Sequence, residues 1–185
     1  MLVTSLILFA VLSRVLPHPA NMTAIAAVAL FGSFRFNSKI EGLFVPVAAM
    51  LVSDIALEIL YRVGVNPFAG FHTGMWHVYL AVTLISFIGF WLKSATKPGY
   101  LEITKLAGAS IVSSFVFFIV TNFGVWLGSG YYPQNMQGLT LCYVAALPFL
   151  RNQITGDLFF TTVIFGSYFA SLRYFEAENK ISIKL

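Results

Sequence analysis

Long apolar runs separated by short polar stretches make up most of the chain. A helix that crosses a bilayer needs about 20 residues, and six runs approach or reach that length: 2–16, 23–36, 43–61, 75–92, 106–127 and 154–173. The first two are short, which predicts tilted or partly embedded helices or a locally thinned membrane. The pattern therefore predicts an all-α, polytopic membrane protein: a six-transmembrane-helix bundle with two short N-terminal spans.

A further apolar piece, 139–150, is too short to span, so we expect a helix that lies at the surface or re-enters between the others. The chain 1–185 then forms a single integral membrane domain. The first run resembles a signal peptide in length, but its first basic residue, Arg14, follows the apolar run instead of preceding it. We expect a retained first helix, with cleavage as the alternative.

Composition supports a membrane protein. Hydrophobic residues make up 58% of the chain and charged residues 10%, with a mean hydropathy of +0.84, whereas soluble domains carry about 25% charged residues. The net charge of +4 does not indicate nucleic-acid binding, because the Lys and Arg residues are spread among the apolar segments. The single cysteine, Cys142, excludes an internal disulfide and a multi-cysteine metal site.

The basic residues predict the orientation. With both termini inside, the inner segments hold eight of the eleven Lys and Arg residues: Arg35, Lys39, Lys93, Lys97, Lys105, Arg173, Lys180 and Lys184. The outer side holds Arg14, Arg62 and Arg151. The positive-inside rule therefore predicts cytoplasmic termini. The same orientation puts His18, His72 and His77 outside, so we expect any specific chemistry at the outer face.

One acidic residue stands out in the third segment. Asp54, Glu58 and Arg62 are spaced i, i+4 and i+8, so they share a helix face. Asp54 falls in the outer half of the membrane, where an ionised carboxylate is costly unless it is paired or hydrated. The three residues predict either a ligand-orienting or proton-linked acid that faces a polar cavity, or an ion ladder along one helix.

The stretch "NPFAGFHTGMWH", residues 66–77, concentrates aromatic residues and two histidines. No Asp or Glu nearby completes a zinc ligand set with them. His72 is flanked by Gly70 and Gly74, which would let the backbone approach a ligand closely. The stretch is either a wall of an outer pocket or an interfacial segment.

The stretch "TNFGVWLGSGYYP" puts Asn122 and Trp126 on one helix face, where they could line a pocket. Gly124 and Gly128 form a G-x-x-x-G pair that suits close helix packing. Tyr131 and Tyr132 are typical of an interfacial aromatic belt.

In "RNQITGD", Thr155 could cap the last helix, with Asp157 in its first turn. Arg151 could pair with Asp157, with Asp54 or with an anionic ligand. The chain has no G-x-S-x-G, Walker A, G-x-G-x-x-G or H-E-x-x-H sequence, so we expect no enzymatic activity.

The order of these elements resembles a known family. The similarity is carried by "PHPANMTAIAAVALFGSFRF", "LFVPVAAMLVSDIALEI" and "TNFGVWLGSGYYPQNMQGLTLCYVAALPFLRNQITGDLFFTTVIFG". The chain resembles a group of small uncharacterised bacterial membrane proteins, the substrate-binding S components of energy-coupling-factor vitamin transporters and, more distantly, the solitary cobalamin-type S components. This implies a bundle in the bacterial cytoplasmic membrane that binds a vitamin-like solute from outside and carries it across.

The resemblance also implies partners and a site. The partners would be the lipid bilayer, the solute and a membrane coupling subunit with ATPases, without a resident cofactor. The site would draw on Asn21, Asp54, Phe68, Phe71, His72, Trp76, Asn122, Trp126, Tyr131 and Tyr143. If the solute were a corrinoid, His72 could reach its cobalt. S components that dock on a coupling subunit usually carry an A-x-x-x-A pattern on the first helix, and this chain has only Ala10 there.

Two other function classes stay open. Short spans and small-residue faces also suit a structural or assembly subunit of a larger membrane complex. An intramembrane enzyme would need two convergent polar groups near Cys142 or Asp54.

Overall fold

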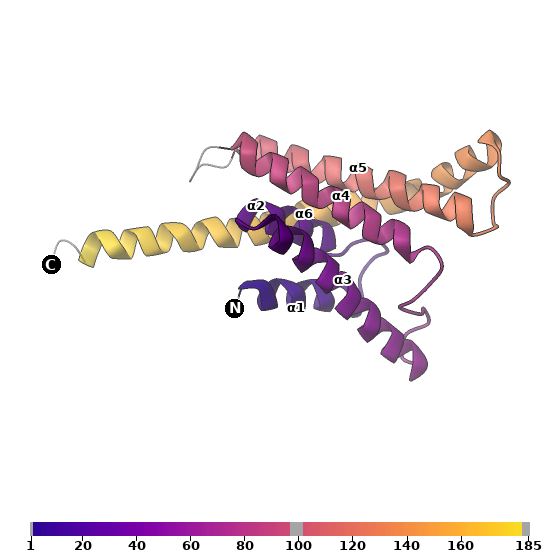
Figure 1. Ribbon diagram of the computed structural model, residues 1–185, viewed down its shortest axis with the longest axis horizontal. Helices are drawn as coiled ribbons and strands as arrows, with labels where there is room; N and C mark the ends of the chain where they lie inside the picture. The colour runs from indigo at the N-terminus through magenta and orange to yellow at the C-terminus, as the bar shows by residue number, and fades with distance from the viewer. Residues whose placement is uncertain (1, 97–101, 183–185) are drawn as a thin grey trace.

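The computed structural model describes residues 2–96 and 102–182, and side chains as far as residue 174. This part of the chain is all-helical, as predicted. Its six helices are α1 (Leu2–Val15), α2 (Ile25–Arg35), α3 (Lys39–Arg62), α4 (Met75–Ala95), α5 (Ile103–Gly128) and α6 (Met136–Ser182). Successive helices run in opposite directions, so the linkers 16–24, 63–74 and 129–135 lie at one end of the bundle, here called the loop end (Figure 1).

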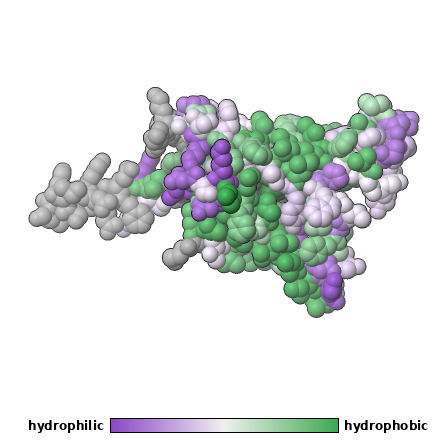
Figure 2. All heavy atoms as spheres, in the orientation of Figure 1, coloured by the Kyte–Doolittle hydropathy of each residue, from purple (hydrophilic) through white to green (hydrophobic). Residues whose placement is uncertain are grey.

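Three helices, α3, α4 and α5, are long and apolar enough to cross a membrane, and α1 and α2 are shorter apolar helices. Figure 2 shows an apolar band between two more polar ends of the molecule. Ile55, Phe87, Trp91 and Phe115 are among the large side chains exposed on the long helices. A monomeric soluble protein rarely exposes so much contiguous apolar surface, so these helices suit a lipid environment.

Helix α2 lies at the centre of the bundle and packs against all five other helices. Every residue from 25 to 33 is buried, so the helix is apolar and enclosed on all sides. Its eleven residues rise only about 16 Å, against a hydrocarbon core of about 30 Å. Helix α2 is therefore too short to span a membrane, and because residues 25–33 are buried it is surrounded by protein along most of its length.

Glycines on the neighbouring helices permit this close packing around α2. A Cβ atom at Gly89 on α4 would lie 2.5 Å from the carbonyl oxygen of Leu30, and one at Gly42 on α3 would lie 3.0 Å from the Cα of Ser33. The Ser33 hydroxyl donates to the Gly42 carbonyl at 3.1 Å. These contacts bring α3 and α4 against α2 at backbone distance.

Helix α6 is continuous over 47 residues, with Pro148 inside it. The sequence predicts two separate segments, 139–150 and 154–173, and the structure joins both stretches in this one helix. The Thr155 hydroxyl donates to the carbonyls of Arg151 and Asn152, at 3.1 and 3.0 Å, so Thr155 lies within the helix and the prediction that it caps the helix start is wrong. The intervening residues are polar, but Arg and Gln are good helix formers, which explains the continuity.

Candidate functional site

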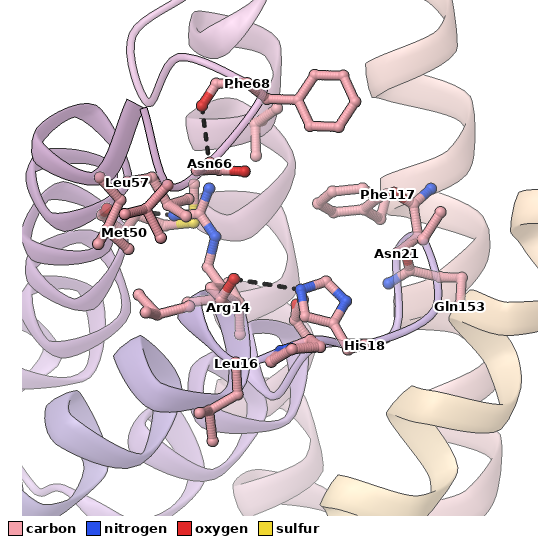
Figure 3. Close-up of a pocket in the computed structure, with 18 residues that line it drawn as sticks. Arg14, Leu16, His18, Asn21, Met50, Leu57, Asn66, Phe68, Phe117 and Gln153 are labelled. Atoms are coloured by element: carbon pink, nitrogen blue, oxygen red, sulfur yellow. Dashed lines mark hydrogen bonds between the residues drawn. The ribbon is translucent and has the colours of Figure 1, made fainter. Parts of the chain in front are cut away.

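A pocket of about 730 Å³ opens at the loop end, within the usual range of small-molecule sites (Figure 3). Its rim comes from the end of α1, the linker 16–24 and the loop 63–74, and its walls come from α2 to α6. The polar side chains that line it are Arg14, His18, Asn21, Thr23, Asn66 and Gln153. Apolar side chains such as Met50, Leu57 and Phe117 supply much of the remaining wall.

Arg14 connects this pocket to a buried acid. Its guanidinium lies 2.7 Å from one carboxylate oxygen of Asp54, and it also donates to the Ser53 hydroxyl and the Met50 carbonyl. The Tyr79 hydroxyl donates to the other Asp54 oxygen at 2.7 Å. Asp54 is 2% exposed, so an ionised carboxylate here needs this pairing. Arg14 lines the pocket, and Asp54 lies behind it.

Asp54, Glu58 and Arg62 share one face of α3 but take part in two separate ion pairs. Glu58 and Arg62 form an ion pair of 2.8 Å along α3, as the ion-ladder interpretation expects. Asp54 instead pairs across helices, with α1 and α4. Its cationic partner is Arg14, so the alternative in which Arg151 pairs with Asp54 is wrong.

The linker 16–24 folds tightly against the end of α1. The two ring nitrogens of His18 lie 2.8 Å from the Pro19 carbonyl and 3.2 Å from the Arg14 carbonyl. Figure 3 marks the contact with Arg14. A neutral imidazole can donate to only one of them. Asn21 has a φ of 62°, a left-handed conformation that asparagine tolerates better than most residues. The linker thus forms a compact rim.

The loop 63–74 lies directly on α3. A Cβ atom at Gly70 would overlap the Asp54 carbonyl oxygen, so only glycine allows this approach. The close approach predicted for Gly70 is therefore made to α3. The Asn66 side chain donates to the Phe68 carbonyl at 3.0 Å, and the Phe68 ring projects from the loop toward the side where Phe117 lies (Figure 3).

The structure brings only part of the predicted site together at this pocket. Asn21 and Phe68 line it, and Asp54 is one side chain behind it. Phe71, His72 and Trp76 are not among the residues that line it, and Phe71 and His72 are exposed in the loop. His72, the predicted cobalt ligand for a corrinoid, thus belongs to the same loop but not to the pocket wall.

The other predicted residues gather at the turn between α5 and α6. The Trp126 indole donates to the Pro133 carbonyl at 2.9 Å, and the Tyr143 hydroxyl donates to the Ile119 carbonyl at 2.7 Å. The Asn122 side chain donates within α5, to the Phe118 carbonyl at 2.8 Å. Tyr131 is 84% exposed. The first two contacts brace the turn, and none of the four residues lines the pocket.

Cys142 on α6 and His77 on α4 both lie in close contact with α5. The buried thiol of Cys142 donates to the Asn122 carbonyl at 3.4 Å. A Cβ atom at Gly124 would overlap the His77 ring, whereas nothing lies within 4 Å of one at Gly128. Gly124 therefore makes room for an imidazole from α4. Within the described residues, no group of three or more His, Cys, Asp or Glu side chains could hold a metal ion.

A family model described as "Family of unknown function (DUF6580)" matches residues 1–178 of the 185. The chain belongs to the DUF6580 family. No curated protein and no solved structure matches it. The DUF6580 match includes the pocket rim, the Arg14–Asp54 pair and the contact between α5 and α6, so each of these features lies within the family's own region.

Five residues of this DUF6580 chain matter to the site and are not among the predicted site residues: Arg14, His18, Asn66, Gln153 and Asp157. Gln153 lines the pocket and donates to Asp157 at 2.8 Å, one helical turn further along α6. Gln153 and Asp157 are spaced i, i+4 in an apolar segment, the same pattern that places Asp54 and Glu58 on one helix face. Arg14 and His18 have the same spacing at the end of the first apolar run.

Proposed function

We propose that this DUF6580 protein binds a small vitamin-like solute in the pocket at the loop end and mediates its uptake, in the manner of an S component. The observation that carries the proposal is the pocket itself, at the bundle end where the linker 16–24 and the loop 63–74 meet. Solute sites are typically concave, mostly apolar and supplied with a few polar groups that fix orientation. The lining residues have that composition.

The pocket chemistry narrows the solute class. Arg14 and His18 are basic, and none of the described lining residues is acidic. The charge of Arg14 is balanced by Asp54, which leaves its remaining N–H groups and the amides of Asn21, Asn66 and Gln153 as hydrogen-bonding groups. This set suits an amphipathic solute that is neutral or anionic.

The proposal places the bundle in the bacterial cytoplasmic membrane. In this arrangement α1 and residues 154–173 of α6 complete the membrane domain beside α3, α4 and α5, with α2 enclosed among them. Arg35, Lys39, Lys93 and Lys105 lie near helix ends away from the loop end. By the positive-inside rule this leaves the loop end outside and both termini in the cytoplasm.

A partner could cover the outer face of α1. Leu8, Leu12 and Leu16 follow one another at i, i+4 and i+8 and are all more than half exposed, whereas Ala10 is fully buried. This apolar stripe fits lipid or a neighbouring helix, such as that of a coupling subunit with ATPases. It equally favours the alternative function, a structural or assembly subunit of a larger membrane complex.

Mass spectrometry of small molecules that co-purify with the protein tests the proposal. We expect one solute to be retained by the wild type and by Phe71→Ala. In Phe68→Ala we expect its Kd to rise about tenfold, a loss of about 1.4 kcal/mol of binding, and less of it to be retained. Both residues are exposed in the same loop, but only Phe68 lines the pocket. A stoichiometric protein partner with no retained solute would instead support the assembly subunit.

A further inference from the structure

Asp157 is a buried acid with no cationic partner among the described residues. It lies on α6 where that helix packs against α5, and it is 1% exposed. The surrounding side chains on the two helices are small and hydroxylated: Ser110 and Ser114 on α5 and Thr161 on α6 are all buried, and Thr161 donates to Ser110 at 3.3 Å. Asp54, by comparison, has both an arginine and a tyrosine.

None of the described charged groups on α2, α5 and α6 forms an ion pair with Asp157. The ion pairs among the described residues are Arg14–Asp54, Arg62–Glu58 and Lys105–Glu102, and Asp157 takes part in none of them. On α2, Arg35 stacks over Tyr168, eleven residues beyond Asp157 on α6. On α6 itself, Arg151 is exposed. An ionised Asp157 would be an uncompensated buried charge, which is strongly unfavourable.

The hydrogen bonds at Asp157 are best satisfied by a neutral carboxyl. Oδ2 lies 2.7 Å from the Ser114 hydroxyl and 2.8 Å from the Gln153 amide nitrogen. The Ser114 hydroxyl also lies 3.2 Å from the Ser110 carbonyl, yet it has a single hydrogen to donate. If Oδ2 is protonated, it donates to Ser114, Ser114 donates to the Ser110 carbonyl, and Gln153 still donates to Oδ2.

The other carboxyl oxygen gives a second indication that Asp157 is protonated. Asp157 Oδ1 is buried and has no hydrogen-bond partner among the described residues. An unpartnered oxygen is much less costly in a neutral acid than in an anion, because the anion loses more solvation on burial. Both oxygens therefore favour the protonated form.

Gln153 connects Asp157 to the pocket at the loop end. Its side chain is 5% exposed, lines the pocket at the loop end and donates to Asp157. The acid is thus separated from the pocket by one amide side chain.

The geometry points to Asp157 as a proton-binding site that exchanges its proton with the pocket past Gln153. Protonation forms the Oδ2–H bond and leaves the carboxyl neutral, and release returns the proton to water in the pocket. The site stands on the contacts between α5 and α6 and needs no bound solute. If the proposed solute is anionic, its presence beside Gln153 further disfavours ionised Asp157, so solute and proton are bound together; this last link rests on the proposed function.

Infrared spectroscopy of the purified full-length protein, with no solute added, tests the site. We expect a carbonyl stretching band of a protonated carboxylic acid at neutral pH that is lost reversibly as the pH rises and shifts on transfer to D₂O. The band should be absent in Asp157→Asn and present in Arg14→Met/Asp54→Asn, a double variant that removes the Asp54 carboxylate without leaving Arg14 unpaired. The asparagine amide is an uncharged substitute for the neutral acid, so we also expect the thermal stability of Asp157→Asn at neutral pH to equal or exceed that of the wild type.

A pair of variants tests whether the proton of Asp157 exchanges through the pocket. Leu57→Trp adds bulk inside the pocket, whereas Leu51→Trp adds it to an exposed position on the same helix. We expect severalfold slower deuterium exchange of the Asp157 carboxyl in Leu57→Trp and wild-type exchange in Leu51→Trp. The proton site is overturned if Asp157→Asn removes no band at neutral pH, or if the band neither titrates nor exchanges. It is also overturned if sodium chloride abolishes the band at constant pH while potassium chloride does not, because the carboxyl would then bind sodium. Failure to retain any solute would count against the proposed function and leave these outcomes unaffected.

Discussion

The Arg14 guanidinium and the Asp54 carboxylate lie 2.7 Å apart, and their contact joins the end of α1 to the middle of α3 beside the pocket. The two side chains are 17% and 3% exposed, so the pair is largely withdrawn from solvent. The value of such a pair lies mainly in mutual neutralisation, because either charge alone would be costly at this position.

Removing one partner of this pair should therefore destabilise the protein more than removing both. We expect Arg14→Met to lower the free energy of unfolding by about 3–5 kcal/mol, because it leaves the Asp54 carboxylate buried without a cation. The double variant Arg14→Met/Asp54→Asn should recover a large part of that loss. Reversible unfolding in mixed micelles measures the difference, with Arg62→Met as a control at a side chain that is 75% exposed. Equal losses in the single and double variants would contradict this account of the pair.

The loop 63–74 should depend on glycine at one position and not at another. A Cβ atom at Gly70 would overlap the Asp54 carbonyl, whereas the nearest atom to one at Gly74 is His72 Nδ1 at 3.5 Å. We expect Gly70→Ala to cost about 1–3 kcal/mol through displacement of the loop from α3. Gly74→Ala should be close to wild type. Thermal unfolding of the two purified variants makes the comparison, and a wild-type midpoint for Gly70→Ala would show that the loop is not seated on α3.

A second glycine pair tests the enclosure of α2. Gly89→Ala would push a methyl group against the Leu30 carbonyl, and we expect it to destabilise the bundle by about 1–3 kcal/mol. Gly108→Ala, on α5, meets nothing within 4 Å. Because alanine is the better helix former, that control should be neutral or more stable by about 0.5–1 kcal/mol. Equal effects of the two substitutions would argue against close packing between α4 and α2.

Labelling of single cysteines tests the orientation. Cys142 is buried, so a membrane-impermeant maleimide should leave the wild type unlabelled in intact cells. In a Cys142→Ser background, Ala20→Cys and Tyr131→Cys at the loop end should react from outside. Ser94→Cys, near the end of α4, should react only after the cells are permeabilised. Labelling of Ser94→Cys alone in intact cells would reverse the proposed orientation.

Local patterns predict the helices well because each apolar run is long enough to define its own secondary structure. They also predict that Asp54 needs a partner, because burial of a carboxylate has a cost that does not depend on the fold. The identity of that partner depends on tertiary structure: Arg14 lies 40 positions earlier, and no spacing rule connects the end of one helix to the middle of another.

The environment of α2 and the role of Asp157 were harder to predict for related reasons. A helix enclosed by protein and a helix surrounded by lipid have the same apolar composition, so residues 25–33 do not reveal which neighbours cover them. The sequence predicts Asp157 in the first turn of the last helix because the polar stretch before it suggests a break between helices. Once α6 is continuous, the same residue lies mid-helix against α5, where a carboxyl has quite different consequences.

The enclosure of α2 also constrains how the protein is made. Four of the five helices that surround α2 follow it in the chain, so when α2 leaves the ribosome most of its eventual neighbours have not been synthesised. Its eleven helical residues are too few to cross the membrane as an independent segment. The surroundings of α2 are therefore complete only after the later helices have been made and have packed against it.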